Sequence, residues 1–102
     1  MGITETSVEE EISRVFRANH KALTGHRVLL FGSRAKGTAG SHSDFDLAVD
    51  GPEPLALEAF YEIKDALDQI PTLHEIDWVD LHRVSQKVSQ NARINGRVLY
   101  EG

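Results

Sequence analysis

The feature that most constrains this chain is a pair of aspartates within the alternating segment DFDLAV. Apolar side chains occupy every second position from Phe45, so Asp44 and Asp46 share the opposite face of a predicted strand. Aspartate is disfavoured in strands because its short side chain competes for backbone hydrogen bonds. The pair therefore predicts either a solvated edge strand or a site where two carboxylates, with Cα atoms roughly 6.5–7 Å apart, hold a hard cation such as Mg2+.

The residues just upstream have the properties of a phosphate cradle. Gly32 lacks a Cβ atom, so a phosphate can approach the backbone closely. Ser33 offers a hydroxyl at the start of a short predicted helix, where free N–H groups attract anions. Arg34 and Lys36 add positive charge. A Gly-Ser pair before a helix is by itself usually only a cap. Combined with the carboxylate pair, it supplies what transfer from a nucleoside triphosphate requires.

The rest of the pattern predicts one α/β domain over residues 1–102, with helices packed on a small mixed sheet of three to four strands. Ser7 and Glu10 form a candidate capping box for the first helix, and Gly25 ends it. The predicted helices span residues 7–23, 33–37, 54–70 and 82–94, and the predicted strands span residues 28–31, 44–49, 74–81 and 97–100.

Composition narrows the classes of function. The chain has no cysteine, no apolar run near the roughly 18–20 residues of a membrane helix, and an acidic N-terminus unlike a signal peptide, which together predict a cytoplasmic location. A net charge of −5 argues against direct nucleic-acid binding. Residues 51–81 carry eight acids and one lysine, whereas residues 82–102 carry four basic residues and one acid. The basic end is either solvated or faces a partner.

The segment LFGSRAKGTAGSHSDFDLAVDG resembles the signature of the DNA polymerase beta-like nucleotidyltransferase superfamily. The signature is Gly-Ser, ten residues, then Asp-x-Asp, here Gly32-Ser33 and Asp44-Phe45-Asp46. The length and flanking pattern resemble the minimal nucleotidyltransferase (MNT) branch, over about residues 8–100. The resemblance implies a nucleotidyltransferase, polymerase beta palm-like fold.

The resemblance also implies roles for particular residues. Asp44 and Asp46 would hold two Mg2+ ions. Asp77, in the predicted strand HEIDWVDL, matches the family's third carboxylate, which helps to hold the metal and takes the acceptor's proton. Asp80 is the competing candidate, but the alternation puts it on the other face, at the strand end.

By the same resemblance the nucleotide site contains Gly32, Ser33, Arg34 and Lys36, and the donor is ATP. This chain has no room for the second helical domain of larger relatives, so either a homodimer or another protein completes the site. In the MNT branch the usual partner is a helical HEPN-type toxin, which some antitoxins adenylylate. Two alternatives stay open: a non-catalytic nucleotide-binding antitoxin module, and a small-molecule transferase of the antibiotic-resistance type.

Overall fold

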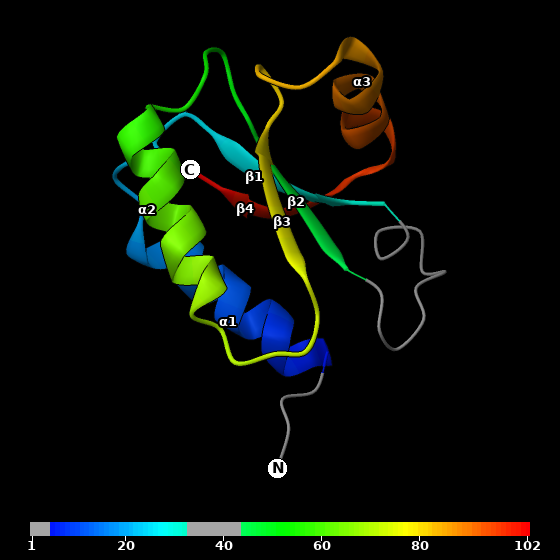
Figure 1. Cartoon of the computed structure of the whole chain (residues 1–102). Helices are drawn as coiled ribbons and strands as arrows, with labels where there is room; N and C mark the ends of the chain where they lie inside the picture. Colours follow the sequence, from blue (N-terminus) through cyan, green and yellow to red (C-terminus); the bar gives the residue numbers. More distant parts are fainter. Residues whose placement is uncertain (1–4, 33–43) are drawn as a thin grey trace.

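The computed structural model describes residues 5–32 and 44–102, which form a four-stranded sheet with three helices (Figure 1). The mixed sheet and the packed helices that the sequence predicts are confirmed. The elements in chain order are α1 (Glu5–Ala18), β1 (Arg27–Phe31), β2 (Phe45–Asp50), α2 (Leu57–Asp68), β3 (Ile76–Asp80), α3 (Gln86–Asn95) and β4 (Arg97–Glu101). No helix in the described part of the chain is long and apolar enough to span a bilayer.

The strand order is β3-β2-β1-β4. β1 runs antiparallel to both β2 and β4, and β2 runs parallel to β3, the two being connected through α2. The β1–β4 register shifts by one residue, because Val28 pairs with Tyr100 whereas Leu29 pairs with Val98. Leu99 is therefore an extra residue, and β4 carries a bulge at its centre.

The main core lies between the sheet and the two helices α1 and α2, which Figure 1 shows together on one side of the strands. The alternation predicted for β2 is confirmed, because its apolar residues at positions 45, 47 and 49 are all buried in this core. Trp78 of β3 joins them, and its indole N–H donates to the Phe60 carbonyl of α2 at 3.1 Å. This core covers one face of the sheet, and Asp46, Asp50 and Asp77 lie on the opposite face.

A smaller apolar cluster lies on that opposite face, where Leu29, Ala48 and Leu81 pack against Ala92 of α3. The carboxylate of Asp50, at the end of β2, accepts hydrogen bonds from Arg27 of β1 at 3.1 and 3.3 Å and from Arg93 of α3 at 3.1 and 3.2 Å. These contacts anchor α3 over one half of this face.

Three predicted boundaries need correction. The first helix begins by Glu5, so Ser7 lies inside it and does not cap it. The helix ends at Ala18, and the chain continues in hydrogen-bonded turns as far as Gly25, which has a φ of +80°. The buried side chain of Leu23 extended the apolar pattern beyond the helix. α3 begins later than predicted, because the Ser85 side chain caps it by accepting from the Val88 N–H at 3.3 Å. The short helix predicted over residues 33–37 lies outside the described residues.

Candidate active site

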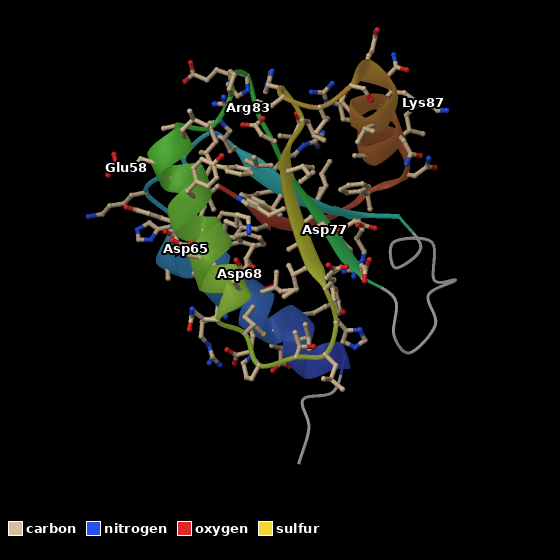
Figure 2. The ribbon with its side chains drawn as sticks, in the orientation of Figure 1. Glu58, Asp65, Asp68, Asp77, Arg83 and Lys87 are labelled. Atoms are coloured by element: carbon tan, nitrogen blue, oxygen red, sulfur yellow. The ribbon has the colours of Figure 1, made fainter. Side chains whose placement is uncertain are left out.

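Two of the predicted catalytic acids lie side by side on adjacent strands. In the parallel β2–β3 ladder Asp46 is the register partner of Asp77, so their Cα atoms are about 4.8 Å apart. Both belong to the sheet face that carries α3. Figure 2 shows Asp77 on the side of β3 away from α2. The half-buried Asp46 and the exposed Asp77 thus form a carboxylate pair at the end of the sheet that α3 leaves uncovered.

Gly32 completes one side of this pair. It follows Phe31, the residue of β1 that pairs with Asp46. Gly32 has a φ of +74°, and a Cβ atom at this position would overlap the Asp46 carboxylate, with Oδ2 the nearest atom. A side chain at residue 32 would therefore displace the acid. The phosphate contact that the sequence predicts for Gly32 stays a prediction, and the group that lies against residue 32 in the structure is the carboxylate of Asp46.

The surroundings of Asp46 disfavour its negative charge. Burial, the charge and hydrogen bond of Asp77, and the charge of Asp44 together raise the pKa of Asp46 from 3.8 to about 6. Asp46 therefore holds its proton more tightly than an ordinary aspartate does. A divalent ion bound to the oxygens of Asp46 and Asp77 would replace that proton and remove the repulsion, and carboxylate oxygens are the ligands that Mg2+ prefers.

Asp44 directly precedes β2 and lies close enough for its charge to act on Asp46. Within residues 5–32 and 44–102, however, no group of three His, Asp or Glu side chains is arranged to hold a metal ion. The structure therefore brings Asp46 and Asp77 together and leaves the three-acid metal site a prediction. Ser33, Arg34 and Lys36 lie outside the described residues, so the phosphate cradle stays a prediction as well.

Asp80, the rival of Asp77, has a structural role. It is the last residue of β3 and is 2% exposed. Its carboxylate accepts hydrogen bonds from the backbone N–H of Leu55 at 2.8 Å and of His82 at 2.9 Å, and Arg83 lies 3.5 Å away. All of these partners belong to connecting loops. Asp80 therefore fixes the loops that follow β2 and β3, and both of its carboxylate oxygens are already engaged.

A polar hollow of about 300 Å3 adjoins the carboxylate pair along β3 and the C-terminal end of α2. The sequence patterns did not reveal it, because its lining residues have no motif or regular spacing. Its charged residues come from α2 and from the residues around the start of β3: Lys64, Asp68, Glu75 and Asp77, with the half-buried His74 beside them.

Comparison with known families and proteins finds relatives of this chain. Residues 10–102 match the family model described as "Polymerase beta, Nucleotidyltransferase". A protein of Haemophilus influenzae (strain ATCC 51907 / DSM 11121 / KW20 / Rd), named "Probable protein adenylyltransferase MntA", is 32% identical over 77 residues, which are 76% of this chain and 68% of that protein.

Solved structures of toxin–antitoxin complexes have the same fold. One is a crystal structure of a toxin–antitoxin with AMP-PNP. Its matched chain has 31% sequence identity to this chain and a TM-score of 0.65, and the match covers 92% of this chain and 73% of the other. A second, the tri-AMPylated HEPN toxin of Shewanella oneidensis in complex with MNT antitoxin, is 25% identical with a TM-score of 0.62, covering 93% and 71%.

Proposed function

This chain belongs to the polymerase beta nucleotidyltransferase family, and on that premise we propose that it transfers AMP from ATP to a hydroxyl of a partner protein. The relative named a protein adenylyltransferase and the AMPylated toxin complex support this acceptor class. The partner is then a HEPN-type helical toxin, and the chain is its antitoxin. The proposal takes residues 1–102 as one minimal nucleotidyltransferase domain that acts in the cytoplasm.

The observation that carries the proposal is the Asp46–Asp77 pair beside Gly32. Asp44, Asp46 and Asp77 would hold two Mg2+ ions. Bound there, the ions would neutralise the charge that develops on the phosphates. In the transfer, the acceptor oxygen forms a bond to the α-phosphorus while the bond to the β-phosphate oxygen breaks and pyrophosphate leaves. The acceptor's proton passes to Asp77, the more exposed acid of the pair.

The triphosphate is assigned to the β1 side of the pair. Gly32 follows β1, and the helix predicted after it would offer free N–H groups and the Ser33 hydroxyl to the β- and γ-phosphates. Arg34 and Lys36 would stabilise the leaving pyrophosphate. With ATP on that side, the acceptor approaches from β3, the strand that carries Asp77. The site therefore has a donor side and an acceptor side, separated by Asp46.

To test the proposal, the chain is incubated with ATP, Mg2+ and the protein that co-purifies with it. Mass spectrometry then identifies which protein gains AMP. We expect the partner to gain AMP from the wild-type chain and to gain no AMP from the Asp46→Asn or Asp77→Asn variant. Binding of each variant to the partner is measured in parallel, so that a lost complex is not mistaken for lost chemistry. A partner that gains no AMP from the wild type overturns the proposal.

A second candidate is the non-catalytic antitoxin module. It is favoured by one observation: the described acids form a pair rather than a three-residue metal site. It predicts that the Asp46→Asn and Asp77→Asn variants neutralise the toxin as well as the wild type does. The transferase proposal predicts that they bind the toxin and leave it active.

A further inference from the structure

The outer edge of β3 carries no strand within residues 5–32 and 44–102, because β3 pairs there only with β2. The Glu75 carbonyl accepts from the Phe45 N–H at 2.8 Å, and the Leu81 N–H donates to the Val49 carbonyl at 3.0 Å, so the odd-numbered residues of this stretch bond to β2. Residues of the other parity, Ile76 and Trp78, direct their backbone groups outward. Such an edge is a template for one further strand.

The polar hollow lies along this edge. It runs from Asp77 past Glu75 and His74 to Lys64 and Asp68 of α2. The loop between α2 and β3 also carries Leu73, which is 96% exposed and directly follows the lining residue Thr72. An incoming chain would thus find backbone partners at the edge, a polar hollow on the α2 side and an apolar contact at the loop.

The charge of the hollow is negative. The ammonium of Lys64 is 3.1 Å from the carboxylate of Asp68, so these two charges offset each other. Glu75 is exposed and forms no ion pair with any described basic residue, so its negative charge is not offset within the described part of the chain. The hollow therefore favours a basic side chain over an acidic one.

We propose that the acceptor binds as an extended polypeptide segment added to the free edge of β3, with a basic side chain in the hollow and a neighbouring hydroxyl residue beside Asp77. Successive side chains of a strand point to opposite faces. In β3 itself Asp77 faces away from the α2 side, to which Trp78 points. An added strand with the same alternation places one side chain under α2 and the next beside Asp77. The Cβ atoms of neighbouring side chains on the two strands are then about 5 Å apart.

This inference rests on the proposed function and specifies its acceptor as a hydroxyl residue directly adjacent to arginine or lysine. A second copy of the chain fits the edge poorly, because it would bring Asp77 and Glu75 against the same acids of its neighbour. A free small molecule would use neither the open edge nor the alternation. The bonds made and broken are those of the transfer described above, with the peptide hydroxyl as the attacking group.

The first test uses short synthetic peptides with one tyrosine flanked by either arginine or glutamate. With ATP and Mg2+ we expect AMP on the arginine peptide and about tenfold less on the glutamate peptide. In Glu75→Lys the KM for the arginine peptide rises by about tenfold. The matched control is Asp65→Lys, which makes the same change in charge on the exposed surface of α2 outside the hollow (Figure 2) and leaves the KM unchanged.

The second test separates strand addition from simple charge attraction. In an added strand only alternate N–H groups face β3. We therefore compare two arginine peptides N-methylated at adjacent positions, and expect one to lose binding and the other to keep it. Equal binding by both peptides, or equal effects of Glu75→Lys and Asp65→Lys, overturns the inference.

Binding is measured by fluorescence anisotropy of labelled peptides without ATP, which keeps this inference distinct from the proposed function. Parity-dependent binding without AMP transfer to any peptide or partner means that the edge accepts a strand but the chain is not the proposed transferase. If AMP is transferred to the partner but neither the flanking residue nor the position of the N-methyl group matters, the proposed transferase activity holds and the acceptor binds in another way.

Discussion

The carboxylate of Asp46 lies against the backbone of Gly32 so closely that residue 32 has no room for a Cβ atom. The same carboxylate is paired with Asp77 through the β2–β3 register. One glycine therefore fixes where an acid of the candidate site can lie, and this relationship can be tested apart from the acids themselves.

Gly32→Ala is expected to lower transfer by on the order of a hundredfold, because the new methyl group displaces the Asp46 carboxylate by about an ångström. The positive φ adds backbone strain of roughly 1–2 kcal/mol. Gly25→Ala is the matched control: its φ is +80°, but its Cβ would meet nothing within 4 Å. Both variants should lose similar stability in urea, and only Gly32→Ala should lose activity. Equal activity in the two variants would show that the contact with Asp46 does not matter.

Asp46→Asn is expected to stabilise the metal-free chain at about pH 7 while abolishing transfer. Burial, Asp77 and Asp44 raise the pKa of Asp46 to about 6, so the folded chain binds a proton more tightly than the unfolded chain, and stability falls as pH rises between about 4 and 6. The gain is on the order of 1 kcal/mol, since partial exposure screens the effect. Urea unfolding in EDTA should show the difference at about pH 7 and not below about pH 4. Mg2+ should stabilise the wild type only.

Asp50→Ala is expected to lower stability by about 2 kcal/mol by leaving two arginines without their partner. Burial alone would raise the pKa of Asp50, but the hydrogen bonds from Arg93 and Arg27 outweigh it and hold the pKa below its usual value. The contribution is therefore present above about pH 4 and is lost as pH falls, opposite in sign to that of Asp46. Asp68→Ala, which removes an exposed pair with Lys64, should cost less than about 0.5 kcal/mol. Comparable losses in the two variants would contradict the anchoring role of Asp50.

Asp80→Asn and Asp77→Asn are expected to have opposite effects. In Asp80→Asn one of the N–H groups of Leu55 and His82 loses its acceptor, which costs about 1–3 kcal/mol, while transfer per folded molecule is retained. Asp77→Asn should fold as well as the wild type and lose transfer. Thermal unfolding and AMP transfer, measured on the same samples, separate the two. Retained activity in Asp77→Asn would remove this acid from the proposed mechanism.

Much of the site could be predicted from the sequence, because the positions of its acids depend on the alternation of apolar and polar residues along the strands. The period of two placed Asp46 on the face opposite the buried Phe45 and Leu47, and it separated Asp77 from Asp80. Helix ends were less accessible. The apolar Leu23 continues the pattern of α1, although its backbone lies in the turns that follow the helix.

The long-range relationships were not accessible. Arg27, Asp50 and Arg93 are far apart in the sequence and meet only because β1, β2 and α3 pack together. The parallel pairing of β2 with β3, which brings Asp46 to Asp77, likewise follows from the path of α2 and has no local signal. The hollow beside Asp77 likewise depends on how α2 packs against β3.

The bulge at Leu99 has a consequence for how the sheet can grow. Its extra residue disturbs β4, the strand at the border opposite β3, and a bulged border is a poor template for another chain. A strand received at β3 would therefore not be relayed through the sheet to a further molecule at β4. The bulge therefore disfavours edge-to-edge stacking of many copies into a continuous sheet.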